Sequence, residues 1–102
     1  MNNVSLELYR TFLMLGKTKN ITSAAKLLYV SQPSVSFALK TLEEQLGTTL
    51  CTRGKKGVTL TAEGQVLFDE LCPAFEHIET AERKLSSLLR LDSGVVSISA
   101  GD

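Results

Sequence analysis

The side chains best suited to chemistry lie in the stretch VSQPSVSFALK, from Val30 to Lys40. Apolar residues recur there at the spacing of a buried helix, while the opposite face carries Gln32, Ser36, Phe37 and Lys40. A glutamine amide can bond an adenine edge, a serine hydroxyl can reach a base or phosphate, and a phenylalanine ring can lie against a thymine methyl. A lysine one turn further on suits a phosphate. This face has the chemistry needed to contact DNA in the major groove.

A helix from about residue 32 to 46 is predicted to present this face. The Ser31 hydroxyl can cap it by accepting from the Ser34 amide, and Pro33 in the first turn gives up an N–H that would lack a partner anyway. Proline is common in the first turn of helices in all kinds of protein. Gln32 and Pro33 could therefore serve only to start the helix, without contacting DNA. Phe37 could belong either to the core or to the groove-facing side, although its helical phase favours exposure.

A short helix before it, with Thr22 as the expected N-cap, would complete a helix-turn-helix. Counting from Ile21, positions 4, 5, 8, 10, 15 and 18 must be small or apolar for two helices to cross steeply. Those positions hold Ala24, Ala25, Leu28, Val30, Val35 and Ala38. The ninth place, where the generic motif prefers glycine, is Tyr29.

The neighbouring elements are predicted from local patterns. A first helix covers about residues 5–15, with Ser5 as its N-cap. The runs TTLCTR and VTL, separated by GKKG, indicate a β-hairpin with a basic tip. Arg53 on its strand and Lys55 and Lys56 at the tip could form a wing that reaches the DNA backbone or minor groove, although solvation alone also explains charges at a tip.

A long helix is expected from Thr61 to about Leu91, kinked or interrupted at Pro73. Its apolar stripe could pack on the domain itself, but so long a helix extends beyond a small body and a partner helix is the better cover. The stripe comprises Leu67, Leu71, Phe75, Ile78, Ala81, Leu85 and Leu88. His77, the single histidine, is expected on the surface.

Composition limits the remaining possibilities. The 102 residues, 43% of them hydrophobic, suit one modest core. The net charge of +0 conceals a basic segment up to Leu60 and an acidic remainder, which suggests that the first half meets a polyanion. Without a spanning apolar run or secretory signal, a soluble cytoplasmic protein with no membrane partner is expected. Cys51 and Cys72 are expected to be reduced thiols.

An enzyme is not expected, because paired acids, a nucleophile with its base and a Gly-rich phosphate loop are missing from the sequence. Metal-ligand spacing is missing as well, so neither a metal nor a cofactor is expected.

The stretches NITSAAKLLYVSQPSVSFALKTLEEQLG and LCTRGKKGVTLTAEG resemble the N-terminal winged helix-turn-helix of LysR-type transcriptional regulators, and the likeness runs from about Leu6 to Leu91. The specific elements are Ala24-Ala25, Ser31-Gln32-Pro33, Ser36, Leu42-Glu43 and Leu60-Thr61-x-x-Gly64. The resemblance implies a bacterial regulator that is dimeric through antiparallel linker helices. It also implies a following domain that senses a small-molecule inducer and forms tetramers, with a first strand near Val95, so this chain would stop just inside that domain.

The resemblance also implies roles for single residues. DNA contact is carried over to Gln32, Pro33, Ser34, Ser36 and Arg53, and phosphate contact to Thr22, Ser31 and Lys40. Members of the family commonly have Arg where this chain has Phe37, which puts the preferred site in doubt. They commonly have Phe where it has Cys51, which should matter mainly to packing.

The predicted fold is mainly α: a winged helix-turn-helix of three helices and a β-hairpin wing (1–60), a long linker helix (61–91) and the start of an effector-binding domain (92–102). The predicted function is sequence-specific binding of double-stranded DNA, with an inverted repeat as operator, by a homodimer. The alternative is a winged-helix protein-interaction module. Salt distinguishes the two, because DNA affinity falls steeply with ionic strength.

Overall fold

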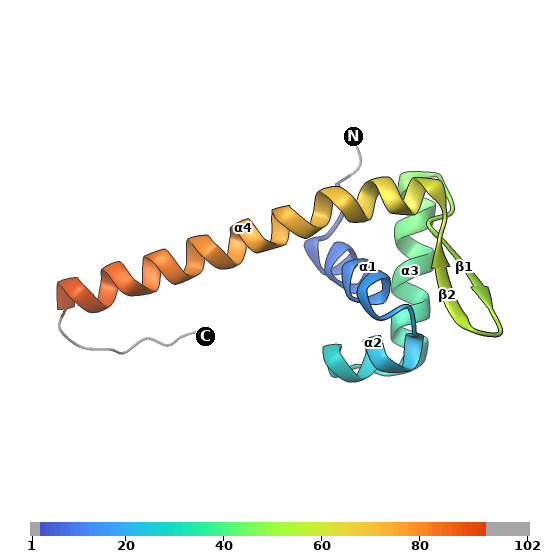
Figure 1. The fold of residues 1–102 in the computed structure, drawn as a ribbon, viewed down its shortest axis with the longest axis horizontal. Helices are drawn as coiled ribbons and strands as arrows, with labels where there is room; N and C mark the ends of the chain where they lie inside the picture. Colours follow the sequence, from blue (N-terminus) through green and yellow to red (C-terminus); the bar gives the residue numbers. More distant parts are fainter. Residues whose placement is uncertain (1–2, 94–102) are drawn as a thin grey trace. The chain divides into compact units, whose positions relative to one another are not determined.

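The computed structural model describes residues 3–93, which form four helices and one hairpin (Figure 1). The elements are α1 Leu6–Thr18, α2 Ile21–Leu28, α3 Gln32–Leu46, β1 Cys51–Gly54, β2 Gly57–Leu60 and α4 Ala62–Ser93. The chain divides into two compact units, Met1–Leu71 and Cys72–Asp102. The start of α4 contributes side chains to the core of the first unit. Within residues 3–93, no helix has the length and apolar character required to cross a membrane.

Helix α1 begins where the sequence predicted and ends later than predicted. The Ser5 side chain accepts a hydrogen bond from the Glu7 amide, as expected of an N-cap. Gly16 was expected to break the helix, but it remains helical and buried. A Cβ atom at Gly16 would lie 2.5 Å from the ring of Phe68, so this glycine permits close packing of α4 on α1. The helix ends instead at Thr18, and its C-cap is Lys19, which has a φ of 56°.

The predicted N-cap of α2 was wrong, and the structure shows the backbone conformation of the unusual Tyr29. Its N-cap is Asn20, whose Oδ1 accepts from the Ser23 amide at 2.9 Å, and Thr22 lies inside the helix. Both residue types cap helices well, so sequence alone did not separate them. The C-cap is Tyr29, with φ 59° and ψ 43°, which is the left-handed conformation. The generic preference for glycine at this place therefore has a backbone cause.

The core of the first unit lies among α1, α2, α3 and the hairpin, with Leu67, Phe68 and Leu71 of α4 packed against it. Of the six predicted helix-turn-helix positions, Val30 departs because it is 45% exposed. The buried core comprises Phe12, Leu15, Ala24, Ala25, Val35, Leu39, Leu42, Leu50, Cys51 and Val58. Helix α3 ends at Gly47 as predicted, with a φ of 78°.

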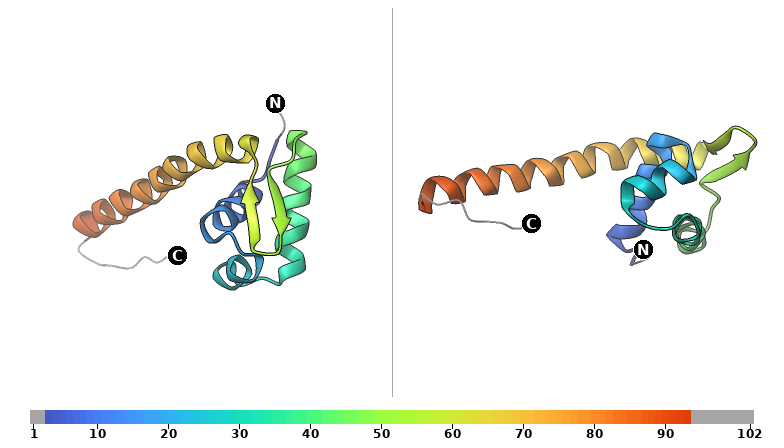
Figure 2. Two further views of the ribbon diagram at one scale, coloured as in Figure 1. Left: turned by 45° about the vertical axis from the view of Figure 1, so that its right-hand side comes forward. Right: turned by 90° about the horizontal axis from the view of Figure 1, so that it is seen from below.

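The hairpin lies beside α3 (Figure 2) and is antiparallel, with Cys51 opposite Leu60 and Gly54 opposite Gly57. Lys55 and Lys56 form its tip, as predicted, although the first strand begins at Cys51 rather than at Thr48. The Val58 amide donates to the Lys19 carbonyl at 3.0 Å, which fixes the second strand to the end of α1.

Helix α4 begins at the predicted cap and continues past the predicted break. The Thr61 hydroxyl accepts from the Gly64 amide at 3.0 Å and donates to the Thr49 carbonyl at 2.7 Å. The interruption expected at Pro73 does not occur. The carbonyl that proline deprives of a partner belongs to exposed Asp69, where water can replace the amide. The strand expected near Val95 lies outside the described residues.

Candidate nucleic-acid interface

The first turn of α3 is exposed to solvent, and the Ser31 side chain caps it. The Ser31 hydroxyl accepts from the Ser34 amide at 3.2 Å, and the two serine hydroxyls lie 2.9 Å apart. Gln32 and Pro33 are exposed beside them. The cap holds the start of the helix in place, so the Gln32 amide group projects from a fixed backbone.

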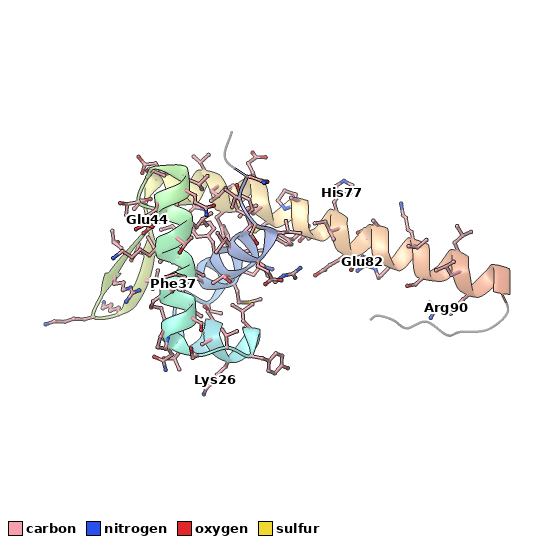
Figure 3. The ribbon with its side chains drawn as sticks, turned by 180° about the vertical axis from the view of Figure 1, so that it is seen from behind. Lys26, Phe37, Glu44, His77, Glu82 and Arg90 are labelled. Carbon is pink, nitrogen blue, oxygen red and sulfur yellow. The ribbon has the colours of Figure 1, made fainter. Side chains whose placement is uncertain are left out.

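Phe37 lies on the exposed face of α3 (Figure 3). Its side chain is 71% exposed. Of the two locations that the sequence left open, the core is therefore wrong. Ser36 is partly buried and Lys40 is exposed. These three residues share a surface hollow, called here the α3–β1 hollow, with Arg53 of the first strand. It is lined by Ser36, Phe37, Leu39, Lys40, Glu43, Cys51 and Arg53.

Glu43 connects α3 to the hairpin. Its Oε2 accepts from the Leu50 amide at 2.8 Å and from the Cys51 amide at 3.2 Å. Both donors belong to buried residues, so the carboxylate satisfies backbone groups that would otherwise lie away from water. The residue pair Leu42-Glu43 was noted in the sequence only as part of the resemblance. No local pattern indicates a bond to residues seven and eight positions further along the chain.

Cys51 lies at the floor of the hollow as a protonated thiol. Burial and the neighbouring Glu43 carboxylate raise the pKa of Cys51 to about 11, and Arg53 lowers it in part. Because the thiolate is the reactive form, this cysteine is a packing residue at neutral pH. Cys51 and Cys72 are both free thiols, as the sequence predicted.

The other predicted DNA contacts lie on two further elements of the first unit. Arg53, Lys55 and Lys56 are exposed on the hairpin, and Arg53 is paired with Val58 across the two strands. Thr22 is exposed on α2. The first unit therefore presents polar and basic side chains from α2, α3 and the wing.

The predicted apolar stripe of α4 falls into two parts. Leu67 and Leu71 are partly buried against the core of the first unit, and Phe75 is buried. Ile78, Leu85 and Leu88 are exposed large hydrophobic residues, and Ala81 is exposed as well. His77 is exposed, as expected for a surface position. The stripe offers an apolar surface to a partner only from Ile78 onward.

Comparison with known proteins matches this chain to a family of bacterial regulators. Residues 6–65 match the family described as "Bacterial regulatory helix-turn-helix protein, lysR family". The chain is 34% identical over 95 residues to the transcriptional regulator BudR of Klebsiella aerogenes, an alignment that covers 93% of this chain and 66% of BudR. It is 44% identical over 61 residues to the regulator HdfR of Escherichia coli O139:H28, covering 60% of this chain and 22% of HdfR. The chain thus spans less than two thirds of either relative.

Solved structures of DNA-binding domains share the fold. The crystal structure of the CbnR_DBD–DNA complex is similar, with a TM-score of 0.73 and 26% identity, and the match covers 85% of this chain and 100% of that one. The BenM_DBD/catB site 1 DNA complex gives a TM-score of 0.71 at 29% identity, covering 90% and 100%. DarR of Vibrio fischeri in complex with DNA gives 0.73 at 32% identity, covering 87% of this chain and 30% of DarR. The chain belongs to the lysR family of bacterial regulatory helix-turn-helix proteins, and it contains the DNA-binding domain of a transcriptional regulator.

Proposed function

We propose that this domain reads a specific DNA sequence, with α3 in the major groove and the hairpin on the backbone or minor groove. The observation that carries the proposal is the exposed first turn of α3, where Gln32 and Pro33 project from a capped helix start. A groove admits such a helix end, and a glutamine amide matches the adenine edge. Arg53, Lys55 and Lys56 add positive charge at the wing.

The phosphate contacts surround this reading turn. We assign them to Thr22, Ser31 and Lys40, with Ser34 and Ser36 closer to the bases. Thr22 and Lys40 are exposed on different helices. Contacts from separate elements fix the orientation of a domain on the duplex without reading sequence.

We further propose that the protein binds as a homodimer through α4. The exposed residues Ile78, Leu85 and Leu88 recur at helical spacing and form a seam that another copy can cover. Two domains held in this way would read an inverted repeat.

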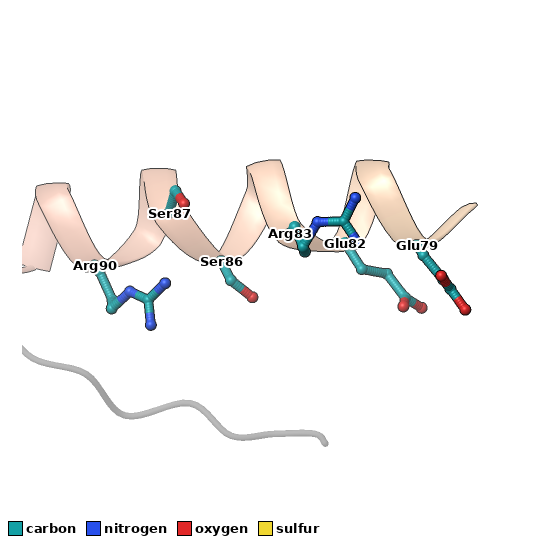
Figure 4. Close-up of a pocket in the computed structure, with 6 residues that line it drawn as sticks. All are labelled: Glu79, Glu82, Arg83, Ser86, Ser87 and Arg90. Carbon is teal, nitrogen blue, oxygen red and sulfur yellow. The ribbon is translucent and has the colours of Figure 1, made fainter. Parts of the chain in front are cut away.

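The charges of α4 favour an antiparallel pair. Between Ala62 and Glu82 every charged residue is acidic, whereas the bases Arg83, Lys84 and Arg90 and one further acid, Asp92, follow. Figure 4 shows this change of sign from Glu79 and Glu82 to Arg83 and Arg90. An antiparallel partner would place its basic segment beside the acidic one, whereas a parallel partner would align like charges.

A further domain is proposed from the family resemblance. We infer a following domain that binds a small-molecule inducer and forms tetramers, in a cytoplasmic regulator. The relatives are longer than the aligned segment, which supports the inference.

Selection of duplexes from a random library by the purified chain tests the DNA proposal. We expect an enriched inverted repeat whose affinity falls with salt, with a log-log slope of about −0.9 per neutralised phosphate. On that site, Gln32→Ala should weaken binding by about 1–3 kcal/mol and have little effect on random DNA. Gln45→Ala is the matched control, because Gln45 is exposed at the far end of α3. No enrichment and no salt dependence would favour a protein-interaction module instead.

Sedimentation tests the dimer. Leu85→Asp should give monomers, because a charge in an apolar seam is costly, whereas Ser87→Asp on the opposite side of α4 should not. A Leu85→Asp variant that remains dimeric would place the seam elsewhere on α4.

A further inference from the structure

The most exposed large hydrophobic side chain of α3 is a phenyl ring outside the core. Phe37 is 71% exposed on the face that also carries Ser36 and Lys40. Complete burial of a phenylalanine is worth about 1.5–3 kcal/mol, and most of that is forgone here. Removal of the ring should therefore leave the fold intact, and a bound partner could gain by covering it.

The surroundings of the ring favour a polyanion. Lys40 and Arg53 line the same α3–β1 hollow as Phe37 and are exposed. The one acidic side chain there, Glu43, accepts two backbone amides of the first strand. A partner that suits this surface combines negative charge with an apolar group.

Duplex DNA combines negative charge with an apolar group in its major groove. Phosphates border the major groove, and the apolar group that a base edge offers there is the C5-methyl of thymine. A phenyl ring lacks the strong hydrogen-bonding groups that read other base edges, so it distinguishes bases by that methyl. Uracil has the same hydrogen-bonding edge as thymine and lacks only the methyl group.

Resting on the proposed function, we propose that Phe37 is a specificity-determining residue that reads a thymine methyl group, with Lys40 and Arg53 on the flanking phosphates. The preferred half-site then contains a thymine that uracil cannot replace. The phenyl ring, and not the glutamine of the first turn, makes this distinction.

The test replaces thymine by uracil, one position at a time, in the duplex selected from the random library. At one thymine of each half-site, uracil should weaken binding by the wild-type chain about fourfold, the factor that about 0.8 kcal/mol for one buried methyl gives. Phe37→Ala should bind the thymine and uracil duplexes equally, and Phe37→Leu should keep part of the difference. Tyr29→Ala, at an exposed aromatic residue outside α3, should keep all of it.

The outcomes separate the two proposals. A chain that selects no site refutes the proposed function, and the inference with it. A chain that selects a site but tolerates uracil everywhere refutes the Phe37 proposal alone. A uracil effect that survives in Phe37→Ala also refutes it, because another residue then reads the methyl group.

Discussion

Removal of the Glu43 carboxylate is the sharpest test of how α3 and the wing are joined. Its Oε2 accepts two backbone amides, from Leu50 at 2.8 Å and Cys51 at 3.2 Å, and both belong to buried residues. Hydrogen bonds to a charged acceptor contribute about 1.5–3 kcal/mol each, and a buried donor left without a partner costs about 1–3 kcal/mol. Since Glu43 is only partly buried, water can replace some of the lost bonding in Glu43→Ala. We expect a loss of about 2–4 kcal/mol in the free energy of unfolding.

Urea unfolding followed by circular dichroism measures this loss. Glu44→Ala is the matched control, because it removes the same charge from an exposed neighbour and should change stability by less than about 0.5 kcal/mol. Glu43→Gln keeps a hydrogen-bond acceptor but loses the charge, so its free energy of unfolding should lie between those of Glu43→Ala and Glu44→Ala. Equal stability of Glu43→Ala and Glu44→Ala would refute the argument that the carboxylate holds the hairpin on α3.

Three other predictions concern the first unit. Tyr29→Gly should raise stability by about 1 kcal/mol in the same assay, since glycine adopts the left-handed conformation without strain, and a loss would contradict the observed φ of 59°. Gly64→Ala should lower stability by about 1–3 kcal/mol or more, because its Cβ would collide with the Leu50 carbonyl oxygen, and an unchanged midpoint would exclude that close approach. The folded pKa of Cys51, about 11, lies above its ordinary value of 9.0, so stability should fall as pH rises from about 9 through 11. Relative to wild type, Cys51→Ala should lose less stability over that range, and identical pH profiles would contradict the raised pKa.

The features predicted correctly from the sequence depend on neighbouring residues. The Ser31 cap, the end of α3 at Gly47 and the Thr61 cap each involve a side chain or backbone within a few positions. Such interactions are encoded locally, so residue type and spacing suffice.

The missed features depend on contacts between distant segments. Gly16 was expected to break a helix because nothing local shows that it faces Phe68. The division of the α4 stripe has the same cause, since Leu71 packs on a core that exists only after folding. The exposure of Phe37 was left open because its helical phase favours the exposed face, whereas a shifted apolar stripe would have placed it in the core.

The Glu43 connection also determines how this domain could fit its target. With the carboxylate on two strand amides and Gly64 against the Leu50 carbonyl, α3 and the hairpin are held at one mutual spacing. On the proposed function, a duplex whose groove widths differ from that spacing must itself bend or twist to be bound. That elastic cost depends on base steps that no side chain touches. Operators would then be ranked in part by their stiffness, at positions where the protein makes no contact at all.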